Sequence, residues 1–121
     1  NLIHLAETVL QPIRDEFGRP VVISSGYRSP ELCEAIGSSS KSQHAKGEAA
    51  DFEVPGMDNM QLAMWISRNT KFDQLILEFY EPGDPNSGWV HCSAVKEGSR
   101  AQVLKASKVE GKTKYENILL V

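Results

Sequence analysis

The residues best suited to chemistry lie in one ten-residue stretch, residues 42–51. A histidine, His44, and a carboxylate, Asp51, stand seven residues apart in it, with Gly47 between them. That separation exceeds the one-turn spacing of metal ligands on a helix, and a glycine among small residues favours a tight bend that leads into a strand. In the predicted strand, Ala49–Val54, apolar residues alternate with acidic ones, so Asp51 lies on the polar face. The stretch therefore predicts an imidazole on a loop, close to a carboxylate on the open face of a sheet.

A third candidate ligand, His91, lies in residues 88–94, a segment that also alternates. Its apolar residues fall on one face, and His91 falls on the other beside Trp89, where a ligand can face solvent. Imidazole nitrogens and carboxylate oxygens are ligands that zinc uses, and three protein ligands leave the fourth position for water, as in catalytic zinc sites. His44, Asp51 and His91 are therefore the candidate ligands of one zinc ion per chain.

Three sequence motifs together resemble one known family. They are Ser-x-His-x-x-Gly-x-Ala-x-Asp over residues 42–51, Ser-Gly-Tyr-Arg-Ser over residues 25–29, and Trp-Val-His over residues 89–91. This set resembles the zinc D-alanyl-D-alanine metallopeptidases, which include cell-wall carboxypeptidases, vancomycin-resistance dipeptidases and phage endolysin endopeptidases. The resemblance runs from about residue 21 to residue 93. It implies that Arg28 neutralises the developing oxyanion, and that the zinc ligands are His44, Asp51 and His91.

Peptide hydrolysis also needs a group that accepts the proton of the attacking water and passes it to the leaving amine. Many relatives carry a glutamate for this purpose three residues before the last histidine, where this chain has Gly88. Others have a histidine two residues before it, where this chain has Trp89. Our candidate is Glu78, on the polar side of a predicted strand adjacent to that of the last histidine, where one branch of the family places its base. Glu81 and Asp84, in the loop that follows, are the alternatives.

Four further residues are candidates for binding the substrate. Ser42 and Gln43 precede the first histidine and could orient it or contact the backbone of a peptide, with a simple capping of the loop as the alternative. Tyr27 and Trp89 are expected to line the substrate groove, with packing at the strand ends as the alternative. For Arg28 the alternative to the oxyanion role is a surface cation paired with an acid.

Length, charge and cysteine content limit the class of protein. We expect residues 1–121 to form a single domain, because such a length can bury a substantial core. The net charge is −3 and no block of cationic residues occurs, which argues against nucleic-acid binding. No apolar run approaches the roughly 20 residues that span a bilayer. The two cysteines, Cys33 and Cys92, are expected to be buried thiols rather than a disulfide or a nucleophile.

The order of predicted elements indicates an α+β domain, with helices packed on a largely antiparallel sheet and the zinc site on its open face. Apolar residues at helical spacing predict a first helix that ends at Gly18. Further helices are predicted over residues 29–37 and from Asp58 onwards. Strands are predicted over residues 21–25, 49–54, 72–80, 89–94, 101–107 and 115–120.

The expected substrates are D-alanine-containing peptides of bacterial peptidoglycan, cut either by a carboxypeptidase or by an endopeptidase. Two other functions remain open. One is a non-catalytic, zinc-stabilised module that binds peptide or cell wall within a larger assembly such as a phage tail, which Gly88 favours. The other is a zinc peptidase that acts on ordinary L-peptides. The expected place of action is the bacterial cell wall, in a periplasmic, secreted or phage-delivered protein.

Overall fold

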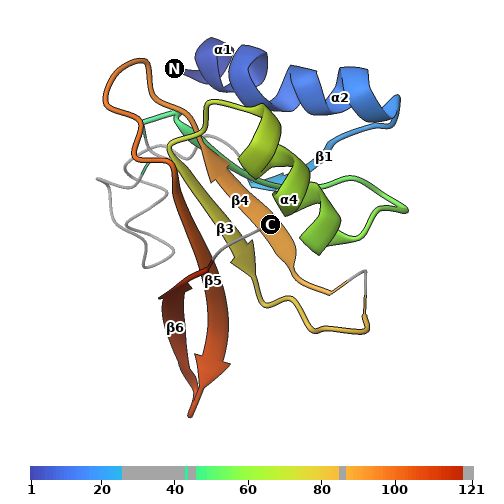
Figure 1. Cartoon of the computed structure of the whole chain (residues 1–121), viewed down its shortest axis with the longest axis vertical. Helices are drawn as coiled ribbons and strands as arrows, with labels where there is room; N and C mark the ends of the chain where they lie inside the picture. Colours follow the sequence, from blue (N-terminus) through green and yellow to red (C-terminus); the bar gives the residue numbers. More distant parts are fainter. Residues whose placement is uncertain (26–42, 44–45, 85–86, 119–121) are drawn as a thin grey trace.

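The structure, a computed structural model of the chain, describes residues 1–25, 43, 46–84 and 87–118. Within these residues one sheet has the strand order β1-β2-β4-β3-β5-β6 and packs against helices (Figure 1). Neighbouring strands are antiparallel except for β3 and β5, which are parallel. The predicted α+β class with a largely antiparallel sheet is therefore confirmed. The strands are β1 (Val22–Ser25), β2 (Ala49–Glu53), β3 (Gln74–Glu78), β4 (Trp89–Ser93), β5 (Gln102–Val109) and β6 (Lys112–Asn117).

The chain begins with one long helical segment, as its apolar spacing predicts. It consists of α1 (Leu2–Leu5), a π-helical turn (Ala6–Leu10) and α2 (Gln11–Phe17). Gly18 ends it with φ +61°, and its N–H donates to the carbonyl of Arg14 at 2.9 Å. The π-helical turn was not predicted. It directly precedes the turn that contains Pro12, which has no N–H to donate to the helix.

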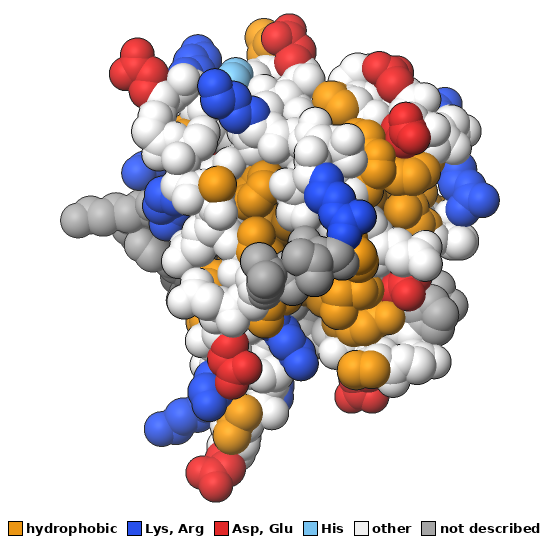
Figure 2. Space-filling model, in the orientation of Figure 1, with side chains coloured by type: hydrophobic (Ala, Val, Ile, Leu, Met, Phe, Trp, Pro, Cys, Tyr) orange, Lys and Arg blue, Asp and Glu red, His pale blue; other side chains and the backbone are white. Residues whose placement is uncertain are grey.

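The helices cover one face of the sheet and build the main core there. Helix α4 (Asn59–Asn69) is capped as predicted by Asp58, whose side chain accepts a hydrogen bond from the N–H of Met60 at 2.9 Å. It crosses β3 and β4 on the side shown in Figures 1 and 2, and Arg68 is its one charged residue. The core side chains on this face come from both helical segments and the central strands: Leu5, Val9, Ile13, Leu62, Ile66, Phe52, Leu75, Leu77, Val90 and Cys92.

No helix among the described residues is long and apolar enough to cross a bilayer.

The opposite face of the sheet carries a smaller buried cluster of Ile76, Leu104 and Ala106. The alternation read from the sequence thus separates two faces, and the acidic and histidine positions fall on the second.

Each strand differs from its predicted bounds by at least one residue, and two strands differ most. The strand predicted over residues 72–80 ends at Glu78, because Phe79 takes φ +54° and breaks the alternation. The strand predicted over residues 115–120 is β6, which begins at Lys112 and ends at Asn117. All of β6 is exposed, so no alternation of apolar residues marks its true start. The β5–β6 hairpin extends away from the helices (Figure 1). The helix predicted over residues 29–37 lies outside the described residues.

Gly88 lies where two segments of backbone approach closely. Its φ is +64°, and a Cβ placed on it would overlap the carbonyl oxygen of Glu78 and come within 2.8 Å of the carbonyl carbon of Phe79. The same segment is tied to α4, because the buried side chain of Asn59 donates to the carbonyls of Ser87 at 3.0 Å and Gly88 at 3.2 Å. No side chain fits at this position without moving the end of β3.

We expect Gly88→Ala to lower the free energy of unfolding by about 3 kcal/mol or more, because it adds a backbone clash to the strain of a positive φ. Gly18→Ala is the matched control: its φ is nearly the same, +61°, but nothing lies within 4 Å of the added Cβ. The control should lose only about 1 kcal/mol. Urea unfolding of both variants measures the difference, and equal losses would contradict the close approach at Gly88.

Candidate metal centre

Asp51 and His91 face each other across two paired strands. The antiparallel register of β2 and β4 places Asp51 directly opposite His91, so both side chains leave the same face of the sheet. The ring Nδ1 of His91 lies 2.9 Å from Oδ1 of Asp51. Both side chains are largely but not fully buried, with 12% of His91 and 17% of Asp51 exposed. Two of the three predicted ligands are thus in contact at a position that solvent can reach.

Glu78 joins this pair from the next strand. In the β3–β4 register Ile76 lies opposite His91 and Glu78 lies opposite Trp89, which makes Glu78 a diagonal neighbour of His91 on the same face. One ligand atom from each of Asp51, Glu78 and His91 lies within 4.8 Å of the others. The prediction that the Glu78 strand is adjacent to the His91 strand is confirmed.

The donor set fits a zinc ion. Carboxylate oxygen and imidazole nitrogen are both zinc ligands, with bonds of about 2.0–2.2 Å, so two ligand atoms of a tetrahedral ion lie roughly 3.3 Å apart. The 2.9 Å between Asp51 and His91 is close to this value, and a small separation of the two side chains admits the ion between them. Two carboxylates beside one imidazole also concentrate negative charge where a cation would bind.

The other predicted site residues divide into two groups. Gln43 and Trp89 are described: Gln43 contacts Asp73, and the Trp89 ring packs on Phe79 with 5.3 Å between ring centroids. The buried indole Nε1 of Trp89 has no hydrogen-bond partner within the described part of the chain. The remaining predicted residues lie outside the described residues: Tyr27, Arg28, Ser42 and His44.

The alternative bases, Glu81 and Asp84, lie in the exposed loop after β3. Their backbones form a tight turn, in which the N–H of Asp84 donates to the carbonyl of Glu81 at 3.0 Å. Among the described residues, the cluster that could hold a metal contains Glu78 and neither loop acid. The geometry therefore favours Glu78 over both.

Cys92 is a buried free thiol, as expected for its side of β4. Burial raises the pKa of its thiol well above the usual range, so it stays protonated at neutral pH and is not a nucleophile. Cys33 lies outside the described residues.

Tyr115 was given no role by the sequence, yet it lies on the face that carries the cluster. Ala106 of β5 pairs with Glu78 on one side and with Tyr115 of β6 on the other, so the three residues form one row across the sheet. Partial burial raises the pKa of Tyr115, and the carboxylates of Glu78 and Asp51 raise it further. The sequence does not predict that Tyr115 lies near Glu78, because no local pattern of residues indicates the parallel pairing of β3 with β5.

A hollow of about 450 Å³ lies elsewhere, beside the end of α4. Arg68, Lys71, Phe72 and Val103 are among its lining residues, and none of the metal-site candidates is. It is separate from the centre.

The open face of the sheet thus carries a cluster of one histidine and two carboxylates that could hold a metal ion. A model of the Peptidase M15 family matches residues 2–93, and these include Asp51, Glu78 and His91. The chain belongs to this family of metallopeptidases, whose members depend on a metal that is usually zinc. The resemblance read from the motifs is thereby confirmed, and the match also includes the first helix. No match was found among curated proteins.

We expect zinc to lower the pKa of Tyr115. In the metal-free protein, partial burial and the nearby carboxylates keep the neutral phenol favoured, so the phenolate forms above the ordinary pKa of 10.0. A cation between Asp51 and Glu78 offsets their charge and shifts the titration to lower pH. Ultraviolet absorbance of the phenolate, with zinc and with a chelator, measures the shift.

Tyr115→Phe should abolish this zinc-dependent shift, whereas Tyr80→Phe should retain it. Burial and Asp58 are the main causes that raise the pKa of Tyr80, and no metal-site candidate is among them. A titration that zinc leaves unchanged would place either the ion or Tyr115 elsewhere.

Proposed function

We propose that the chain is a zinc-dependent peptidase that hydrolyses D-alanine-containing peptides of bacterial peptidoglycan. The observation that carries the proposal is the contact of Asp51 with His91 beside Glu78, in a chain of the M15 family. His44 completes the ligand set in this proposal, as the motif of residues 42–51 implies. A bound zinc ion supplies a Lewis acid that makes water nucleophilic near neutral pH.

The side chains have separate roles in the proposed reaction. Glu78 accepts the proton of the attacking water and returns it to the leaving amine, for which its position next to the ligand pair is suitable. Arg28 pairs with the developing oxyanion through its planar guanidinium. Ser25, the last residue of β1, pairs with Asp51, so the chain enters the segment that carries Arg28 beside the centre.

The absence of a glutamate at position 88 does not weaken the proposal. Gly88 is required by its contact with the backbone of Glu78 and Phe79, and a glutamate there would not fit. Glu78 instead supplies a carboxylate from the neighbouring strand. The feature that favoured a non-catalytic module therefore has a structural explanation that is compatible with catalysis.

The proposed substrate and place of action follow from the family motifs. A carboxypeptidase would release a terminal D-alanine, and an endopeptidase would cut a cross-link or stem peptide. Both reactions take place at the bacterial cell wall, which is where we propose that the chain acts, in a periplasmic, secreted or phage-delivered protein.

Substitution of Glu78 separates the role of a general base from that of a metal ligand. As a base, Glu78→Gln should keep about one zinc per chain and reduce turnover on the order of 10²–10⁴-fold, because the amide cannot accept the proton. If Glu78 is instead a metal ligand, the Glu78→Gln variant should lose both the zinc and the activity. Elemental mass spectrometry and a peptide-hydrolysis assay distinguish the two.

Glu81→Gln is the matched control, since this carboxylate lies in the exposed loop that follows the same strand. It should retain both zinc and turnover. His44→Ala should lose zinc, and an unchanged metal content in that variant would remove His44 from the proposed ligand set.

Paired synthetic peptides test the substrate class directly. The zinc-loaded protein should release D-alanine from a peptide that ends in D-Ala-D-Ala, or cut cross-linked wall fragments, and should leave the L-Ala-L-Ala counterpart intact. Mass spectrometry of the products identifies the bond that is cut. Cleavage of only the L-peptide would indicate a general zinc peptidase, and bound zinc without any cleavage would indicate a binding module.

A further inference from the structure

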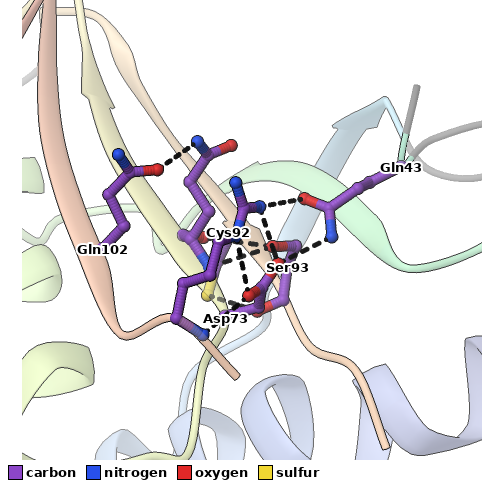
Figure 3. Close-up of polar contacts among 7 residues, drawn as sticks. Gln43, Asp73, Cys92, Ser93 and Gln102 are labelled. Carbon is purple, nitrogen blue, oxygen red and sulfur yellow. Dashed lines mark hydrogen bonds and ion pairs between the residues drawn. The ribbon is translucent and has the colours of Figure 1, made fainter. Parts of the chain in front are cut away.

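A buried carboxylate, Asp73, lies just before β3 and is surrounded by donors. Only 3% of the residue is exposed. Its Oδ1 accepts hydrogen bonds from the backbone N–H of Arg100 at 2.9 Å and from the guanidinium Nε at 3.0 Å. Its Oδ2 accepts a third from Nη2 of Arg100 at 2.7 Å. Figure 3 shows this cluster between the ends of several strands.

The carboxylate and the backbone of Asp73 are both held by hydrogen bonds. A buried charge is costly unless it is paired and hydrogen-bonded, and Asp73 has both kinds of partner. The hydrogen bond from Arg100 is the main cause that holds the pKa of Asp73 well below its usual range, so it is a carboxylate at neutral pH. The backbone of Asp73 is fixed as well: its N–H donates to Ser93 at 2.8 Å, and its carbonyl accepts from Gln102 at 2.9 Å.

The same carboxylate holds Gln43. Nε2 of Gln43 donates to Oδ2 of Asp73 at 2.8 Å, while Oε1 of Gln43 lies 3.5 Å from Nη2 of Arg100 (Figure 3). Both ends of the amide thus contact the pair, in which Asp73 is buried and the Arg100 side chain is half-exposed. This arrangement favours an orienting role for Gln43 over direct contact with a substrate.

Backbone hydrogen bonds also hold the chain at Gln43 and at Glu48. The carbonyl of Gln43 accepts from the N–H of Glu48 at 2.8 Å, and the carbonyl of Glu48 accepts from the N–H of Ala94 at 2.9 Å. The side chain of Asn1 donates to the carbonyl of Lys46 at 2.7 Å. Gln43, Lys46 and Glu48 are therefore each tied by a hydrogen bond to the described part of the chain.

We propose that Asp73 and Arg100 form an anchor that positions the proposed metal ligands through Gln43. Gln43 directly precedes His44 in the chain, and Glu48 precedes the β2 strand that carries Asp51. The anchor also contacts Ser93, two residues from His91 on the same face of β4. Asp73, Arg100 and Gln43 are positioning residues in this scheme, which rests on the proposed assignment of His44 as a ligand.

Zinc affinity of a Gln43→Met variant tests the anchor, because methionine preserves the length of the side chain and removes both polar contacts. We expect zinc to bind on the order of 10-fold more weakly, as is typical when a residue that orients a ligand is changed. Competition with a chromophoric chelator measures the affinity, and thermal unfolding of the metal-free protein is recorded beside it.

Gln102→Met is the matched control. It breaks the hydrogen bond that Nε2 of Gln74 donates to Oε1 of Gln102 at 2.9 Å, on neighbouring strands, and it removes no side-chain contact to Gln43. Its zinc affinity should equal that of the wild type. If both glutamine variants weaken zinc binding equally, the effect is a general one on stability and the anchor is overturned.

A double-mutant cycle with Asp73→Asn adds a second criterion. If Gln43 acts through Asp73, the zinc affinity of the double variant should be about that of the single variant with the lower affinity. If the two substitutions act independently, their fold-losses in zinc affinity should multiply, which would overturn the coupling. Should Asp73→Asn fail to fold, the comparison of Gln43→Met with Gln102→Met decides alone. Wild-type protein that binds no zinc would overturn the proposed function together with the anchor, while normal binding by Gln43→Met would overturn the anchor alone.

Discussion

The antiparallel pairing of β2 with β4 is the constraint on which the centre depends. It sets Asp51 opposite His91, and a slip of one residue would turn one of the two side chains to the other face. The register is fixed from the opposite side of the sheet, where Phe52 and Val90 are fully buried under the helices. Packing of the apolar core therefore determines the geometry of the polar face.

The two faces of the sheet make different contributions to the molecule. The helix-covered face gains stability from apolar burial. On the other face, Asp51, Glu78 and His91 bring ligand atoms within 4.8 Å of one another, a donor set that could hold a cation. Binding of a metal is then coupled to the stability of the folded chain, because the unfolded chain offers no such arrangement.

Local patterns were sufficient for the parts of the site that lie on regular strands. Alternation alone gave the faces of β2 and β4, and it placed Glu78 on the polar side of its own strand. The family motifs supplied the remaining candidates, of which His44 and Arg28 lie outside the described residues. The single-domain prediction stays a prediction.

Three features that the sequence did not predict depend on contacts between distant segments. Asp73 and Arg100 are 27 residues apart, and nothing in either local sequence indicates the other. The positive φ of Phe79, which ends β3, accompanies the approach of the Gly88 segment and leaves no apolar pattern. Tyr115 reaches the functional face only through a parallel strand pair and an exposed hairpin.

The close approach at Gly88 has an evolutionary consequence. A glutamate at position 88 and the present path of the backbone after Glu78 exclude each other, because the space that the side chain would need is filled by main-chain atoms. A lineage with its carboxylate on β3 cannot transfer it to position 88 by one substitution without first rebuilding the connection between β3 and β4. On the present backbone, a side chain at position 88 and the close approach of the two segments therefore exclude each other.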